Sequence, residues 1–383
     1  MEEKIMKSKF VLSLCILILA VMFSASCFAA EKILFAVVGP MTGDSAAQGI
    51  QMQVATQLAI NEINGSGGVN GKEFEFIVGD DMANPNQAVM VAQKFSTNNN
   101  ILFILGHNNS GCSIAALPTW EKAGLPVISP TNTNPTITTL GHKNYFRIIV
   151  NDDIVITQLT KLAVIELGFK NLALIWENTD YGRGMRDVAY KNIPGLGAKV
   201  LGDESYVPAV DRDYSSQITK FKGAGVDCVL FLGEYTAGAL FLKQSVNLGF
   251  NAQVVSSSGC SNPKLIEIAG EAAEGFYSTS GFDPDDKRPK QAKFIAGFET
   301  LSKDKPGEWG AHAYDIVYMV KKAIEMGGTT REKLIEVLHQ SDFEYDGVTG
   351  LTKFDQYGDV PGKHAFFLKV ENGNFVNFVP TKF

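Results

Sequence analysis

Short apolar runs alternate with longer stretches of helical period along most of the chain, and this alternation occurs twice. The runs of the first set lie near residues 33–38, 73–78, 101–105 and 126–128, and those of the second near 172–176, 199–205, 226–232 and 253–255. Apolar strands that alternate with helices are typical of βαβ units, in which crossover helices join parallel strands. The pattern therefore predicts an α/β fold with two doubly wound parallel-sheet lobes.

Helical periodicity fills the intervals between these runs. The predicted helices lie near residues 49–64, 85–98, 113–122, 154–167, 181–192, 214–224, 237–248 and 263–269, and after Tyr277 near 289–301, 309–326 and 330–339. Residues 145–153 are interpreted as a crossing between the lobes, and the chain from Phe354 onward as short strands and turns.

The order of these segments predicts a chain that crosses between the lobes more than once. We assign residues 31–150 and 279–352 to an N-terminal lobe and residues 151–278 and 353–383 to a C-terminal lobe. Several crossings make a multi-segment hinge, which favours closure of the lobes around a ligand.

The N-terminus has the pattern of an export signal. Three lysines precede a largely apolar run at residues 10–23, and small residues follow it. We interpret residues 1–30 as a cleaved secretory signal peptide, because the run is shorter than the ~20 residues that cross a bilayer. Cys27 leaves a lipoprotein signal open, although Ser24 stands where a Leu-like residue is expected. The mature protein is therefore expected in the periplasm or otherwise outside the cytoplasmic membrane.

Charge and motifs exclude several classes of function. After residue 30 the chain has 31 basic and 39 acidic residues, a net charge of −8, which makes nucleic acid an improbable partner. It contains no G-x-S-x-G, HExxH or phosphate-loop motif, so we expect neither an enzyme nor a cofactor. Cys112, Cys228 and Cys260 lack metal-site spacing and are predicted to be free thiols, with Cys228 buried in an apolar strand.

Two hydroxyl-rich loops, residues 106–111 and 129–133, each follow an apolar run. In an open α/β sheet, ligands bind beyond the carboxyl ends of the strands, where exposed amides and hydroxyls capture anionic groups. Ser110 stands where it could cap a helix that starts near Ser113, so that the helix dipole favours an anion there. The alternatives are that Ser110 is only a cap and that Thr131 and Thr133 belong to a solvated turn. The loops predict a small polar or zwitterionic ligand.

Several motifs occur in an order that resembles the branched-chain amino-acid binding proteins of ABC importers. They are Gly39-Pro40-Met41-Thr42-Gly43, Gly68-Val69-Asn70-Gly71-Lys72, Asp80-Asp81, Gly106-His107, Ser129-Pro130-Thr131, Asp180-Tyr181-Gly182-Arg183-Gly184 and Ala269-Gly270-Glu271. The resemblance covers nearly the whole mature chain. It implies a type I periplasmic-binding fold and a monomeric solute-binding protein that delivers a hydrophobic or branched-chain amino acid to a membrane permease.

The resemblance also implies roles for individual residues. Ser110 and Thr133 match the residues that bind the ligand carboxylate, and Thr131 matches the position whose backbone carbonyl accepts from the ammonium. Tyr181 and Tyr235 match the tyrosines that close over the ligand from the second lobe. His107, which has no partner at metal or triad spacing, and Trp176, which ends a strand, are interpreted as structural.

Two positions depart from the family pattern, and both concern the ligand. Ser258 stands where an acidic residue commonly pairs with the ammonium, and Gln48 stands where an aromatic residue is usual. Glu234 is the leading substitute for the acid, and Asp152 or Asp153 are others, because a buried ammonium needs a partner. The alternatives are an aliphatic or aromatic carboxylate or amide without an ammonium, and a ligand-sensing module of the same fold.

Overall fold

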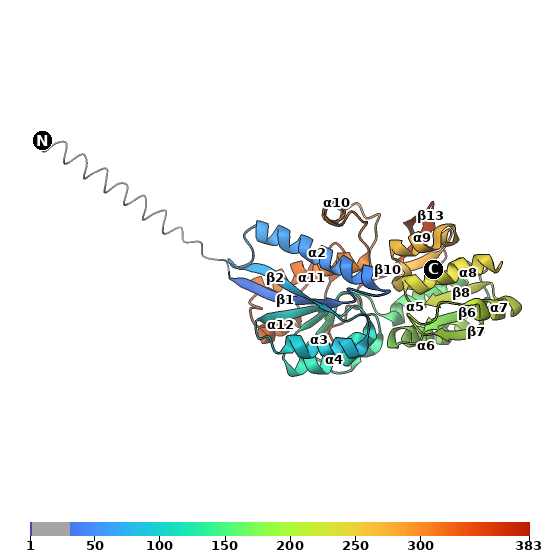
Figure 1. Ribbon diagram of the computed structural model, residues 1–383, viewed down its shortest axis with the longest axis horizontal. Coiled ribbons are helices and arrows are strands. Elements are labelled where there is room, and N and C mark those ends of the chain that lie inside the picture. The colour runs from blue at the N-terminus through green and yellow to red at the C-terminus, as the bar shows by residue number, and fades with distance from the viewer. Residues whose placement is uncertain (2–30) are drawn as a thin grey trace.

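The computed structural model describes Met1 and residues 31–383, which form two lobes side by side (Figure 1). Apart from Met1, the predicted signal peptide, with Cys27, lies outside the described residues. None of the helices described is both long and apolar enough to cross a membrane.

The first lobe is built on a five-stranded, fully parallel sheet of order β2-β1-β3-β4-β5. Its strands are β1 (Lys32–Gly39), β2 (Glu73–Asp80), β3 (Ile101–Gly106), β4 (Val127–Ser129) and β5 (Tyr145–Arg147). Its helices are α2 (Ala46–Gly65), α3 (Pro85–Ser96), α4 (Ser110–Lys122), α10 (Pro289–Ser302), α11 (Glu308–Glu325) and α12 (Arg331–Leu338), with a 3₁₀ turn at Pro135–Thr139.

Strand β1 shows how the sequence produces two layers of helices. Phe35 and Val37 pack into the core beneath α2 and α11, whereas Ala36 and Val38 pack into the core beneath α3 and α4. Successive strand residues point to opposite faces, so a continuously apolar strand is buried on both. Gly310 lets α11 approach α10 closely, since a Cβ there would lie 3.1 Å from the Phe298 ring of α10.

The second lobe has a seven-stranded sheet of order β14-β13-β10-β9-β8-β6-β7. Its strands are β6 (Asn171–Glu177), β7 (Lys199–Tyr206), β8 (Cys228–Leu232), β9 (Gln253–Ser256), β10 (Tyr277–Ser280), β13 (Phe366–Glu371) and β14 (Asn374–Phe378). Strands β6 to β10 are parallel, and β13 and β14 add an antiparallel edge. Its helices are α5 (Asp152–Lys161), α6 (Asp180–Gly195), α7 (Ser215–Gly223), α8 (Tyr235–Asn247) and α9 (Pro263–Ala269).

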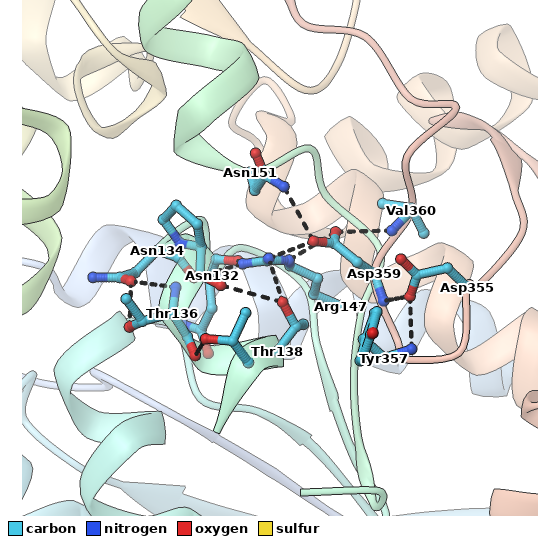
Figure 2. A network of polar contacts seen from close by, with 12 residues as sticks. Asn132, Asn134, Thr136, Thr138, Arg147, Asn151, Asp355, Tyr357, Asp359 and Val360 are labelled. Atoms are coloured by element: carbon cyan, nitrogen blue, oxygen red, sulfur yellow. Dashed lines mark hydrogen bonds and ion pairs between the residues drawn. The ribbon is translucent and has the colours of Figure 1, made fainter. Parts of the chain in front are cut away.

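The chain passes between the lobes after β5, after β10, and between the small hairpin β11 (Tyr345–Gly347)–β12 (Gly350–Thr352) and β13. A polar network joins the first and third of these crossings (Figure 2). The buried Arg147 guanidinium donates to Asp359 through Nε at 2.9 Å and through a second nitrogen at 2.5 Å. Asn151 donates to the same carboxylate at 3.1 Å. The two crossing segments are therefore held together by one partly buried carboxylate.

The α/β prediction is confirmed, but three short strand segments were missed. Strand β5 lies inside the stretch interpreted as a crossing, and β10 and the β11–β12 hairpin lie where only helices were expected. Strand β10 consists of Tyr-Ser-Thr-Ser, which has no apolar signal, yet all four residues are buried. It is stabilised by its neighbours, since the Ser278 hydroxyl donates to the Ser257 carbonyl at 2.9 Å.

Candidate ligand-binding site

A small cavity lies between the lobes, at the carboxyl ends of strands from both sheets. The first lobe contributes Asn108, Asn109, Ser110, Thr131, Glu308 and Trp309, and the second contributes Tyr181, Glu234, Ser258 and Gly259. The cavity encloses about 20 Å³, little more than the ~15 Å³ that one water molecule needs. A larger ligand can therefore enter only when the lobes part.

Two loops of the first lobe are fastened to each other at this cavity. The Thr131 hydroxyl donates to Asn108 Oδ1 at 2.8 Å, and Asn132 Nδ2 donates to the Asn108 carbonyl at 2.6 Å. The Ser129 hydroxyl accepts from the Asn132 N–H at 3.0 Å. These bonds fix the loops after β3 and β4 before any ligand arrives.

Ser110 lies at the cavity, but not as the cap that the sequence predicted. Helix α4 begins at Ser110 itself, one turn earlier than expected, and Asn109 occupies the N-cap position. The prediction of a cap on a helix starting near Ser113 is therefore wrong. The chemical consequence survives, because the first N–H groups of α4 and the Ser110 hydroxyl lie at the cavity, where a helix N-terminus favours an anion.

Thr133 is buried beside this loop and does not line the cavity. Its hydroxyl has no hydrogen-bond partner among the described residues, and its carbonyl accepts from the Asp152 N–H at 2.8 Å. Asp152 is likewise buried outside the lining, and burial raises the pKa of its carboxyl to about 7. Asp153 does not line the cavity either.

The two tyrosines of the second lobe are separated. Tyr181 lines the cavity, and its hydroxyl lies 2.9 Å from the Ser257 hydroxyl. Burial raises the pKa of Tyr181 well above its ordinary value, so the phenol stays neutral. Tyr235 is the first residue of α8 and packs into the apolar core with Phe241 rather than at the cavity. The structure therefore brings one of the two predicted tyrosines to the site.

Gln48 joins the lobes and does not line the cavity. Its Oε1 accepts from Asn108 Nδ2 at 2.7 Å, and its Nε2 donates to the Glu234 carboxyl in the other lobe. Burial, together with the neighbouring Glu177, raises the pKa of Glu234 well above its ordinary value. Gln48 therefore joins the first lobe to a buried carboxyl of the second.

Glu308 and Trp309 are cavity residues that the sequence reasoning missed. Glu308 is the first residue of α11, and its carboxyl accepts from the Gly281 N–H at 2.6 Å. Burial raises the pKa of Glu308 to about 7, while the Gly281 N–H and the Ser258 hydroxyl favour its charged form. A Glu in the first turn of an apolar helix is a recognisable signal of a helix start. Only the second crossing between the lobes places it in the cleft.

Further contacts at the rim of the cleft hold the lobes together. Asn134 Nδ2 donates to the Asp180 carbonyl at 2.7 Å, and the Thr236 hydroxyl donates to the Asp44 carbonyl at 2.9 Å. The Asp44 carboxylate pairs with Arg212 at 2.5 Å. The lobes are therefore closed over the cavity.

The structural interpretations of His107, Trp176 and the cysteines are confirmed. Trp120 Nε1 donates to His107 Nε2 at 3.1 Å, so the other ring nitrogen carries the proton that binds Asp81 at 2.7 Å. Trp176 packs against the second-lobe core and donates to Asp203 at 2.8 Å. In residues 31–383 the three cysteines are free and buried.

Comparison with known proteins agrees with this architecture. The family model described as periplasmic binding protein matches residues 32–374. A leucine-, isoleucine-, valine-, threonine- and alanine-binding protein of Pseudomonas aeruginosa is 33% identical over 341 residues, which cover 88% of this chain and 90% of the relative.

Solved structures give the same result. The substrate-binding protein LivJ of Streptococcus pneumoniae, in complex with isoleucine, has a TM-score of 0.85 at 26% identity and covers 91% of this chain and 100% of its own. The leucine-binding protein LivK of Thermotoga maritima has a TM-score of 0.83 at 27% identity, covering 91% and 98%. The two-lobed chain therefore belongs to the periplasmic binding protein family.

Proposed function

We propose that this protein is the solute-binding component of an ABC importer and captures a hydrophobic, branched-chain amino acid between its closing lobes. The observation that carries the proposal is the composition of the cavity, which combines the N-terminus of a helix and several hydroxyls with two carboxyl groups. This arrangement matches a zwitterion. The relatives from Pseudomonas, Streptococcus and Thermotoga, whose names specify leucine or isoleucine, support the same ligand class.

Each end of the zwitterion has complementary groups. The ligand carboxylate is assigned to Ser110 and the first amides of α4, because a helix N-terminus stabilises an anion. The ammonium is assigned to the Thr131 carbonyl and to one of the two cavity carboxyls, Glu234 and Glu308. The apolar side chain is assigned to the Trp309 and Tyr181 rings, which enclose an aliphatic group and exclude water.

A carboxylate without an ammonium suits this cavity less well. The lining contains Glu234 and Glu308 but no lysine, arginine or histidine. A ligand with only a negative charge would find no cationic side chain in this lining, and any ionised carboxyl there would repel it.

The proposal also places the protein outside the cytoplasmic membrane as a monomer that delivers its ligand to a membrane permease. The predicted signal peptide and the family support this location. Cell fractionation of the native host tests it, because a full-length cytoplasmic product that keeps Met1 would contradict it.

A calorimetric comparison tests the ligand class. Leucine, isoleucine and valine are titrated into the mature protein beside two analogues of leucine, 4-methylpentanoate without the ammonium and 3-methylbutylamine without the carboxylate. We expect the amino acids to bind at least a hundredfold more tightly than either analogue. Small-angle scattering then reports whether ligand shifts the protein toward the closed form. Tighter binding of 4-methylpentanoate than of every amino acid would refute the assignment.

A further inference from the structure

The cavity holds two buried carboxyl groups, one from each lobe, and they differ in how well the protein supports a negative charge. Glu308 belongs to the first lobe and Glu234 to the second. An ammonium buried between the lobes gains most from a carboxyl whose negative charge the protein's own donors support and orient.

Glu308 has three features that stabilise its carboxylate. It is the first residue of the 18-residue helix α11, where the helix dipole favours a negative charge. The Gly281 N–H donates to Oε2 at 2.6 Å, and Ser258, which lines the same cavity, favours the charged form and lowers the pKa of the carboxyl. The side chain is 2% exposed, so these donors act with little competition from solvent.

Glu234 lacks this support. Its side chain occupies the N-cap position of α8 without making a capping hydrogen bond, and its side-chain partner is the neutral amide of Gln48. Glu177 lies against it, with Oε2 buried and without a partner among the described residues. Two adjacent buried carboxyls do not both ionise, so the Glu234–Glu177 pair retains a proton.

No neighbouring cation neutralises Glu308 in advance. His312 lies one turn along α11 with Nδ1 2.8 Å from the Glu308 carbonyl, and burial lowers its pKa to about 3, so the ring is neutral. Lys363, from the third crossing, donates to the Thr349 hydroxyl at 2.8 Å and faces Asp315. Burial raises the pKa of Glu308 to about 7, and a cationic group that enters the cavity would favour ionisation of this carboxyl and pair with it.

We infer that Glu308, supported by Ser258, is the carboxylate that receives the ligand ammonium and so determines selectivity for amino acids over their deaminated acids. The inference rests on the proposed function, and it names the residue that binds the ammonium. It replaces Glu234, the substitute that the sequence favoured. The family pattern places an acidic residue at position 258, where this chain has a serine. Here the Glu308 carboxylate and the Ser258 hydroxyl together take that role.

The experiment compares Glu308→Gln with Glu234→Gln, which tests the competing assignment, since both changes remove one cavity carboxyl and keep its volume. Leucine and 4-methylpentanoate are titrated into each variant and into the wild type by calorimetry at neutral pH. We expect Glu308→Gln to weaken leucine binding more than tenfold and to leave 4-methylpentanoate unchanged or slightly tighter. We expect Glu234→Gln to change both ligands by less than threefold.

Ser258→Ala provides a milder variant, because it removes one hydroxyl and changes no charge. We expect it to weaken leucine two- to fivefold without affecting 4-methylpentanoate, and it keeps the test available if Glu308→Gln fails to fold. A selective loss of leucine in Glu234→Gln, with Glu308→Gln unaffected, would overturn the inference and leave the proposed function intact. Failure of the wild type to bind any amino acid would overturn both.

Discussion

Replacing Asp359 with Asn tests the physical basis of the connection between the lobes. Asp359 lies in the third crossing, and its carboxylate binds two guanidinium nitrogens of Arg147. The Arg147 side chain is fully buried, and that of Asp359 is 13% exposed. An asparagine keeps the shape of the side chain but leaves the guanidinium charge buried without a counter-ion (Figure 2).

The expected cost follows from the environment of Arg147. Removing one partner of a buried ion pair typically destabilises a protein by about 3–5 kcal/mol. Arg147 keeps other acceptors, which are the Asn134 carbonyl at 2.7 Å and the Thr138 hydroxyl at 3.0 Å. We therefore expect the lower end, about 3 kcal/mol of unfolding free energy.

The pH dependence of this cost has a definite sign. Arg147 holds the pKa of Asp359 below its ordinary value in the folded protein. A carboxyl with a depressed folded pKa contributes stability above its unfolded pKa, about 4, and loses it as pH falls through the folded value. The difference in unfolding free energy between wild type and Asp359→Asn should therefore be constant from pH 5 to 8 and become smaller in acid.

Denaturant titration measures this loss. In a Trp176→Phe background, fluorescence comes from Trp120 and Trp309, both buried in the first lobe. We expect Asp359→Asn to unfold at a lower denaturant concentration, while the slope of the unfolding free energy against denaturant stays unchanged. Glu267→Gln is the control, because its exposed pair with Lys264 should contribute no more than about 0.5 kcal/mol. If Asp359→Asn lowers the unfolding free energy by no more than Glu267→Gln does, the reasoning is refuted.

Two further predictions concern the site and the cysteines. Replacing Ser110 with Ala removes one hydroxyl at the cavity, worth roughly 1.5–3 kcal/mol to a charged group. Affinity for the best amino acid should fall about tenfold or more by calorimetry, and an unchanged affinity would reject the carboxylate assignment. Cys112, Cys228 and Cys260 are buried, and burial raises the pKa of each thiol. A thiol reagent should therefore label none of them until denaturant is added, and rapid labelling of the native protein would contradict this burial.

Local periodicity predicted most of the fold because apolar strands and amphipathic helices carry their own signals. Helix α9 was predicted with its observed bounds, Pro263–Ala269, since Asn262 caps it and proline begins it. Strand β10 was missed because Tyr-Ser-Thr-Ser carries no apolar signal, and the hydrogen bond from its Ser278 hydroxyl to the Ser257 carbonyl is not visible in local sequence.

The site was predicted only in part for a related reason. Ser110, Thr131, Tyr181, Glu234 and Ser258 follow strand ends, and the structure brings them to one cavity. Thr133, Tyr235 and Gln48 are close in sequence to such ends, yet their side chains do not line it. The sequence indicates which residues lie near the end of a strand. Whether the side chain of such a residue points into the cavity depends on how it packs. Glu308 follows no strand in sequence and reaches the cavity through the crossing after β10.

Closure of the lobes depends on contacts that are individually weak. Asp44–Arg212 is partly exposed, and exposed ion pairs contribute about 0–1 kcal/mol. Gln48 to Glu234 and Asn134 to Asp180 are polar contacts that water would replace in an open form. The protein's own interlobe contacts therefore leave open and closed forms close in free energy. A ligand shifts that balance only by its differential affinity for the closed form. The ligand gains this difference by contacting both lobes, with Ser110 and Glu308 on one and Tyr181 on the other. A molecule that engages the first lobe alone should bind without closing the cleft.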